Sequence, residues 1–314
     1  MDTRVGDRTR LVQRDRAYWL RLLRLTVFAL GAAIFVMVFI APSLFGALGM
    51  WWLTHPQCAG DGGRTPGDFG HAYEEVVVVA RETGDAHRGF YIPSRNGAHV
   101  IVPPPLNSAR GHTLHEIDVL ARHGYGVLSY ESRACNGAGR VTSLGYLEVE
   151  DLAGALNWLL ARPDVDPERI GVHGFSSAGA TATMAAARYP QLRAVVAEGG
   201  YHDLGPGTLG VGGNIVEAAV RAAAALTYHL ATGVDIREVS PIAVIGQVAP
   251  RPILLIYGSR EVTLRGAREQ LAAAGENAAL WEVPGAGHGD YVLVAPEAYA
   301  RRLVAFFDAA LLGE

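Results

Sequence analysis

From residue 74 onward, short apolar segments of strand length alternate with segments of helical periodicity. Apolar residues three and four apart predict one buried helix face, whereas short apolar runs rich in β-branched residues predict strands. Before Pro163, for example, Leu152, Leu156 and Leu159 lie on one face. Strands are expected at residues 75–79, 89–92, 100–102, 126–130, 169–174, 194–197, 253–257 and 279–283, and helices at 113–123, 178–188, 215–230 and 296–312.

This alternation predicts an α/β fold with a mostly parallel central sheet and helices on both of its faces. The first two strands are expected to form an antiparallel pair. Functional residues in such sheets gather at the carboxyl ends of the strands. Residues 200–250 contain a Gly-rich stretch and one apolar helix, which is enough for a small cap or no cap.

The first sixty residues have the pattern of a membrane anchor. No residue from Leu25 to Leu53 is charged, and a spanning helix needs about 20 residues. Residues 1–24 carry seven arginines against three aspartates, and such a bias holds the N-terminus in the cytoplasm. Pro42 is expected to end or bend the helix, because proline cannot donate a helical hydrogen bond. We expect a single-pass membrane protein whose residues 54–314 lie outside the cytoplasm.

A cleaved signal peptide is the alternative, with residues 47–49 as a passable cleavage site. The apolar run is longer than the roughly 7–15 residues of a signal-peptide core, which favours the anchor. A buried core helix is disfavoured by the one-sided charge. Residues 54–73 are rich in Gly, Pro and polar residues and predict a linker. The expected organisation is a basic cytoplasmic leader at 1–24, a transmembrane segment at 25–53, that linker, and one catalytic domain at 74–314.

Composition excludes several kinds of chemistry. All 27 basic residues are arginine, so the chain has no Ser–Lys dyad, Schiff-base lysine or phosphate-loop lysine. A net charge of -4 argues against nucleic acid as a partner. Cys58 and Cys135 match no metal-ligand spacing; they pair if the domain lies in an oxidising compartment, and two free thiols are the alternative. Neither a metal nor an organic cofactor is expected.

Ser176 is the candidate nucleophile. It lies in Gly-Phe-Ser-Ser-Ala-Gly at residues 174–179, between an expected strand and an expected helix. A serine in such a turn is held in a strained conformation with its hydroxyl projecting above the sheet, and small residues on either side prevent clashes. An ordinary strand-to-helix turn is the alternative. The context on both sides favours the nucleophile.

A nucleophilic serine needs a base and an acid. His288 follows the last expected strand and has glycines on both sides. Glu261 follows the strand before it, where the acid is expected, and Asp203 is the fallback acid. The chain order Ser176, Glu261, His288 is the nucleophile–acid–base order of hydrolases built on such a sheet. A solvated loop charge is the alternative for Glu261.

An oxyanion needs two donors. The backbone N–H of Ser177, at a helix N-terminus, is the first candidate.

From about residue 74 to 312 the chain resembles the α/β-hydrolase superfamily, particularly its serine-aminopeptidase-like and dienelactone-hydrolase-like branch. The resemblance rests on residues 130–133 (YESR), 162–171 (RPDVDPERIG), 174–179 (GFSSAG), 240–242 (SPI), 249–252 (APRP) and 285–289 (GAGHG). It implies the α/β-hydrolase fold and hydrolase activity. The resemblance also implies a second oxyanion donor in the loop after the third strand, which reads Val-Pro-Pro-Pro-Leu at residues 102–106. Prolines have no N–H, so the resemblance makes the amide of Leu106 the candidate donor; if the register shifts by one residue, Pro105 occupies the donor position and half of the hole is lost. Three features depart from the pattern: the triproline in place of His-Gly, Ala178 in place of glycine, and Glu261 in place of aspartate.

The expected function is that of a membrane-anchored serine hydrolase with a Ser-Glu-His triad. Ser176 attacks an acyl carbonyl, His288 takes its proton, Glu261 orients His288, and water releases the acyl group. Expected partners are a small-molecule or short-peptide acyl substrate and the lipid bilayer through residues 25–53. A carboxylesterase leads within this class, with an exopeptidase or acyltransferase as the alternative. A degenerate hydrolase fold used for binding or scaffolding is the alternative from another class, since fold alone does not decide function.

Overall fold

The computed structural model describes residues 5–136, 141–205 and 213–313. The chain divides into two compact units, residues 1–49 with 212–226, and residues 50–211 with 227–314. Residues 1–4 of the expected leader and 206–212 of the Gly-rich stretch lie outside the described residues.

The first unit contains the apolar N-terminal helix. Helix α1 (Val5–Phe35) passes through a π-helical turn (Val36–Ile40) into α2 (Ala41–Thr54). Residues 16–54 form a helix long and apolar enough to cross a membrane. Pro42 does not end it: the N–H of Ala41 bonds to the carbonyl of Val36, which widens the turn just before the proline that has no N–H to donate.

A second helix, α7 (Ile215–Thr232), contributes residues 215–226 to this first unit. Its backbone comes close to α2 at Gly46, where an added Cβ would lie 2.2 Å from the carbonyl oxygen of Val220. Only glycine allows two helices to approach this closely. Gly46 therefore fixes where α7 crosses α2.

The second unit is built on one eight-stranded sheet with the order β1-β2-β4-β3-β5-β6-β7-β8. Strands β1 and β2 pair antiparallel, as do β2 and β4, and every other pair is parallel. The expected α/β sheet with its antiparallel opening is thus confirmed. The strands are β1 (Glu74–Val79), β2 (Ala86–Ile92), β3 (His99–Val102), β4 (Gly126–Tyr130), β5 (Ile170–Phe175), β6 (Ala194–Glu198), β7 (Ile253–Gly258) and β8 (Ala278–Val283).

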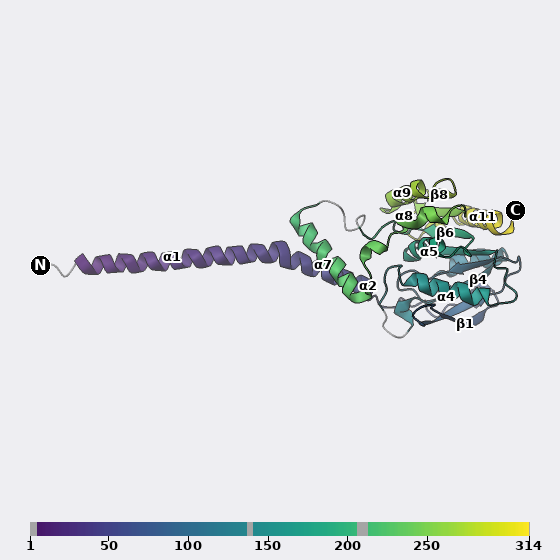
Figure 1. Ribbon diagram of the computed structural model, residues 1–314, viewed down its shortest axis with the longest axis horizontal. Helices are drawn as coiled ribbons and strands as arrows, with labels where there is room; N and C mark the ends of the chain where they lie inside the picture. The colour runs from purple at the N-terminus through teal and green to yellow at the C-terminus, as the bar shows by residue number, and fades with distance from the viewer. Residues whose placement is uncertain (1–4, 137–140, 206–212, 314) are drawn as a thin grey trace. The chain divides into compact units, whose positions relative to one another are not determined.

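Helices cover both faces of this sheet, and Figure 1 shows α4 and α5 side by side. On one face α3 packs against α11, and their apolar residues form a buried cluster with β3, β4, β6, β7 and β8. Helix α5 contacts α8, and α8 contacts α9. The α-helices of this unit are α3 (Leu114–Arg122), α4 (Glu148–Leu160), α5 (Ser177–Arg188), α8 (Pro241–Val244), α9 (Leu264–Ala274), α10 (Tyr291–Val294) and α11 (Pro296–Phe307), and shorter helical turns are Pro66–Phe69, Arg133–Cys135, Ile236–Glu238, Ile245–Val248 and the π-helical Asp308–Leu312.

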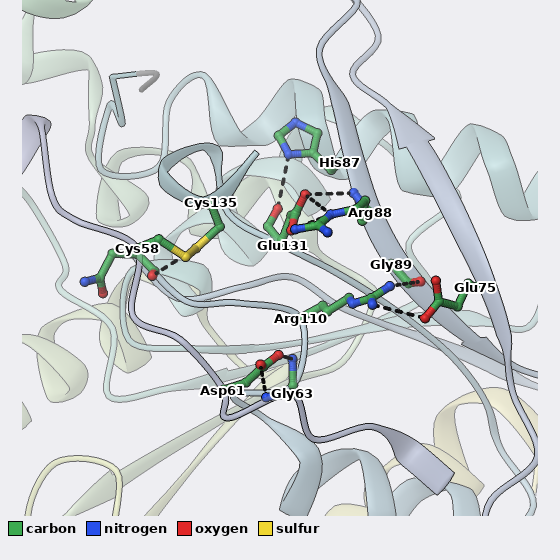
Figure 2. Close-up of polar contacts among 12 residues, drawn as sticks. Cys58, Asp61, Gly63, Glu75, His87, Arg88, Gly89, Arg110, Glu131 and Cys135 are labelled. Atoms are coloured by element: carbon green, nitrogen blue, oxygen red, sulfur yellow. Dashed lines mark hydrogen bonds and ion pairs between the residues drawn. A yellow bond between two sulfur atoms is a disulfide. The ribbon is translucent and has the colours of Figure 1, made fainter. Parts of the chain in front are cut away.

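Residues 57–61 of the expected linker pack along the loop that follows β3. The N–H of Ala59 donates to the carbonyl of Asn107 at 2.7 Å, and a disulfide joins Cys58 to Cys135. Of the two alternatives for the cysteines, the structure has the pair. Figure 2 shows this disulfide together with the ion pair of Arg88 and Glu131, 2.9 Å long, at the end of β4. The segment after the apolar helix is therefore part of the globular unit.

Candidate active site

Ser176 occupies the turn between β5 and α5. Its backbone has φ 57° and ψ −124°, a strained conformation for a residue with a side chain. The N–H of Ser176 donates to the carbonyl of Glu198 at 2.7 Å, which ties the turn to the end of β6. The turn also needs Gly174, since an added Cβ there would lie 2.1 Å from the carbonyl oxygen of Ala178. The backbone thus has the tight, strained form that the sequence predicts around Ser176.

His288 lies in the loop after β8, within hydrogen-bonding distance of both Ser176 and Glu261. Its Nε2 lies 3.1 Å from the Ser176 Oγ, and its Nδ1 lies 3.0 Å from the Glu261 Oε2. With its proton on Nδ1, His288 donates to Glu261 and accepts from the Ser176 hydroxyl. A hydroxyl, an imidazole and a carboxylate in this row can move a proton from the hydroxyl to the imidazole.

The imidazole is positioned by its neighbours but stays accessible. The Phe175 ring lies against it, with 4.9 Å between the ring centroids. Gly199, with φ +57°, leaves it room, because an added Cβ would lie 2.8 Å from Nδ1. The His288 side chain is 48% exposed and that of Glu261 only 2%. The base therefore faces solvent while the acid that holds it is buried.

The Glu261 carboxylate receives four hydrogen bonds. Besides His288, the donors are the N–H of Gly258 at 2.6 Å, the Thr263 hydroxyl at 3.0 Å and the Tyr291 hydroxyl. Burial by itself would raise the pKa of Glu261, but these hydrogen bonds outweigh it and hold the pKa below its ordinary value. Glu261 is consequently charged and fixed in place.

Asp203, the fallback acid, accepts a hydrogen bond from the N–H of Gly205 at 2.8 Å. The carboxylate bonded to His288 belongs to Glu261. The glutamate side chain, longer than the usual aspartate, spans the distance because the chain turns back after β7, where the N–H of Glu261 donates to the carbonyl of Gly258.

Sequence reasoning missed Tyr291, which donates to Glu261 and lies in the short helix after the His288 loop. Its only signal in the sequence is an aromatic residue three positions after the histidine. It also missed the contact of Phe175 with His288. Tyr291 contacts Glu261 and Phe175 contacts His288, but neither aromatic residue was assigned a role from the sequence.

The loop after β3 meets the start of α5. The N–H of Leu106 donates to the hydroxyl oxygen of Ser177 at 2.7 Å. The two residues named for the oxyanion hole are thus neighbours, but the Leu106 amide is directed at a side chain. Ser177 is the first residue of α5, so its own N–H has no acceptor within the helix.

A small cavity adjoins these two residues. Its lining includes Pro104, Leu106, Leu144, Gly145, Ser177 and Thr181. Leu144 has φ 59°, one of two side-chain-bearing residues with positive φ among those described, the other being Ser176.

The loop that contains Leu144 is tightly held. Glu148 accepts hydrogen bonds from the N–H and hydroxyl of Ser143 and from the N–H of Gly145. The Tyr228 hydroxyl donates to the carbonyl of Ser143 at 2.6 Å. These bonds hold the strained residue at the cavity wall, and strain of this kind clusters at functional sites.

Arg133, in the segment 130–133 that carries part of the family resemblance, lies in a buried ion pair. It donates to both oxygens of Asp151 at 2.7 Å and lies 3.3 Å from Asp85. Burial alone would lower the pKa of Arg133, but the bonds to Asp151 raise it above its ordinary value. The guanidinium therefore fixes the loop after β4 beside the cavity.

Comparison with known proteins gives a consistent result. The family described as X-Pro dipeptidyl-peptidase (S15 family) matches residues 71–286, more than half of the 314 residues. A thiohydrolase of Arthrinium phaeospermum is 31% identical over 131 residues, which are 39% of this chain and 42% of the thiohydrolase, so the match spans less than half of that relative.

Solved structures match over most of the chain. The esterase Pf2001 of Pyrococcus furiosus superposes with a TM-score of 0.65 at 22% identity, covering 82% of this chain and 98% of the esterase. The α/β-hydrolase GrgF of Penicillium sp. sh18 superposes with a TM-score of 0.61 at 18% identity, covering 77% of this chain and 99% of GrgF. At these identities the likeness shows the α/β-hydrolase fold.

Proposed function

The chain belongs to the X-Pro dipeptidyl-peptidase (S15) family of hydrolases with the α/β-hydrolase fold, and from this membership we propose that it is a serine hydrolase whose nucleophile is Ser176. The observation that carries the proposal is the hydrogen-bonded row from Ser176 through His288 to Glu261. Nucleophile, base and acid come from loops after three different strands, in the chain order of this fold.

The proposed reaction proceeds through an acyl-enzyme. His288 removes the Ser176 proton at Nε2 as the Ser176 oxygen attacks the acyl carbonyl. The same imidazole then protonates the leaving group, and Glu261 stabilises the imidazolium formed in between. Water attacks the acyl-enzyme with His288 again as the base, and the acid product leaves. The backbone N–H of Ser177 is the first proposed oxyanion donor, and the second involves Leu106, whose amide is hydrogen-bonded to the Ser177 hydroxyl.

A carboxylic ester is the proposed substrate class. The structural likeness to the esterase Pf2001 supports an ester, and a small cavity lined by Leu106, Leu144 and Thr181 among others lies beside Ser177, next to the proposed nucleophile. Family membership supports a peptide amide as the second candidate, and the partial match to a thiohydrolase supports a thioester. The small molecule or short peptide that carries the acyl group is the proposed partner, and no cofactor takes part in the proposed reaction.

We further propose that residues 25–53 anchor the protein in a membrane with residues 54–314 outside the cytoplasm. The apolar helix of sufficient length supports the anchor, and the arginine-rich flank supports the orientation. The Cys58–Cys135 disulfide supports an oxidising compartment, since such bonds are rare in the cytosol.

The serine-hydrolase proposal is tested by turnover of short-chain nitrophenyl esters, nitrophenyl thioesters and aminoacyl nitroanilides. Ser176→Ala and His288→Ala should each lower kcat by on the order of 10⁶, because nucleophile and base act as a unit. Ser240→Ala, a serine whose hydroxyl caps no helix, is the matched control and should keep wild-type activity. No turnover of any of these substrates by the wild type would favour the alternative, a binding or scaffolding module.

A further inference from the structure

The loop after β3 offers few backbone donors for an oxyanion. Pro103, Pro104 and Pro105 have no N–H, and the N–H of Leu106 already donates to the Ser177 Oγ at 2.7 Å. A short N–H···O bond of this kind is well formed. The donor that such hydrolases take from this loop is therefore not available from the Leu106 amide as it lies.

The loop is also held where it is. The carbonyl of Asn107 accepts from the N–H of Ala59 at 2.7 Å, and the carbonyl of Ser108 accepts from the N–H of Ser132 at 3.0 Å. A disulfide joins Cys58, which directly precedes Ala59, to Cys135, which lies three positions after Ser132. These contacts hold the residues that directly follow Leu106 in place.

The hydroxyl of Ser177 can supply the missing donor. A hydroxyl has one hydrogen to donate as well as lone pairs to accept. The oxygen accepts from Leu106, and within residues 5–136, 141–205 and 213–313 the hydroxyl hydrogen has no acceptor. Ser177 is half-buried, lines the cavity and directly follows Ser176. Its hydrogen is free to turn toward a carbonyl oxygen bound over the nucleophile.

We propose that the Ser177 hydroxyl is the second oxyanion donor, with the Leu106 amide orienting and polarising it. The proposal deepens the proposed hydrolase function and rests on it. The residue after the nucleophile would then provide both donors, its backbone N–H and its side-chain O–H. A hydroxyl that accepts one hydrogen bond donates another more strongly, so the Leu106 amide acts on the oxyanion through Ser177. Ser177 is a catalytic residue and Leu106 a positioning residue.

The rival geometry makes the opposite prediction. If the Ser177 side chain rotates away when substrate binds, the Leu106 N–H becomes the direct donor. Removing the Ser177 hydroxyl would then cost nothing, and removing the Leu106 N–H would cost the full value of an oxyanion donor, about 10²–10³ in kcat. The two geometries are separated by comparing variants of Ser177 with Leu106→Pro.

The experiment measures kcat and KM for a nitrophenyl ester and the inhibition constant of a trifluoromethyl ketone, which forms a tetrahedral oxyanion adduct on the nucleophile. Ser177→Ala should lower kcat about 10²–10³-fold with little change in KM, and should raise the inhibition constant of the ketone by a similar factor. Ser177→Thr keeps the hydroxyl and should stay within about tenfold of wild type. Leu106→Pro should cost less than Ser177→Ala, and Leu106→Ala, which keeps the N–H, should be mild.

Ser177→Cys, which replaces the hydroxyl by a weak S–H donor of similar size, answers the question if Ser177→Ala does not fold. Ser177→Ala or Ser177→Cys with wild-type kcat and wild-type ketone affinity would overturn the proposal, whatever Leu106→Pro does. Inactive wild type would instead mean that the hydrolase proposal has failed. A Ser177→Ala variant with lower kcat but unchanged ketone binding would also overturn the proposed role of the Ser177 hydroxyl, because a residue with a merely structural role does not act on the oxyanion.

Discussion

Glu261 and His288 are hydrogen-bonded to each other but differ in solvent exposure, since the side chain of Glu261 is 2% exposed and that of His288 48%. The four donors around the carboxylate, Tyr291 among them, fix it in one position. An imidazole that must both accept and return a proton gains from a partner that neither moves nor exchanges with water. The buried acid therefore accounts for how an exposed loop histidine keeps one orientation.

This environment leads to a pH prediction for the stability of the fold. The pKa of Glu261 is lower in the folded protein than its ordinary value of 4.5, so its contribution to stability is present above that value. The contribution is lost as the pH falls below 4.5 and through the folded pKa. Glu261→Gln, which cannot titrate, should lose less stability than the wild type over this interval.

The measurement is the urea midpoint of both proteins at pH 6, 4 and 3, with Glu297→Gln as control for an exposed glutamate. Parallel pH dependences of wild type and Glu261→Gln would contradict the prediction.

In activity assays near neutral pH, Glu261→Gln should lower kcat by on the order of 10²–10⁴, less than Ser176→Ala, because the amide still holds the imidazole in part.

The elements around the site are joined by contacts that the sequence does not reveal. The strand ends that carry Ser176, Glu261 and His288 could be predicted, because apolar periodicity identifies strands and their order places the loops. The contact of Leu106 with Ser177 lies between segments 71 positions apart and depends on side-chain packing. For the same reason the hydrogen bond from the Leu106 amide to the Ser177 hydroxyl was not foreseen.

Other features could only be left open at the level of sequence. Two cysteines admit a pair or two thiols, and only the folding of residues 57–61 onto the loop after β3 brings Cys58 to Cys135. The positive φ of Leu144 has no signal in the sequence, because the residue is neither glycine nor asparagine. A predicted linker hides these contacts, since Gly- and Pro-rich segments can also pack against a domain.

The disulfide should stabilise the domain and hold the loop that carries Leu106. It closes a separation of 77 residues, for which the chain-entropy model gives about 4 kcal/mol. Reduction, or the pair Cys58→Ser and Cys135→Ser, should therefore lower the melting temperature by several degrees. It should also lower kcat, because the loop is then free to shift.

Calorimetry and ester turnover with and without reductant check this prediction. The double serine variant, which should not respond to reductant, is the control for effects of the reductant on the rest of the protein. Equal melting temperatures for oxidised and reduced wild type would show that the bond contributes nothing to stability.

At the scale of the whole molecule, three independent features support the proposed membrane topology: the uncharged span at 25–53, its arginine-rich flank and the disulfide. An anchor would keep the hydrolase at the membrane surface, where its substrates would have to arrive. A reporter that is active only in the cytoplasm should give no signal when fused after Glu314 and a strong signal when fused before Met1.

The opposite pattern of reporter signals would reverse the orientation. A soluble protein released after residues 47–49 would instead support cleavage of a signal peptide. Fractionation of membranes washed with carbonate distinguishes an anchored chain from a released one.

Covalent labelling shows whether Ser176 is the nucleophile of a working hydrolase. A fluorophosphonate probe reacts with serines that an adjacent base activates. We expect one adduct per chain on the wild-type protein, mapped by mass spectrometry to the peptide that contains Ser176, and no adduct on Ser176→Ala. Equal labelling of both proteins, or no labelling of a folded wild type, would contradict it.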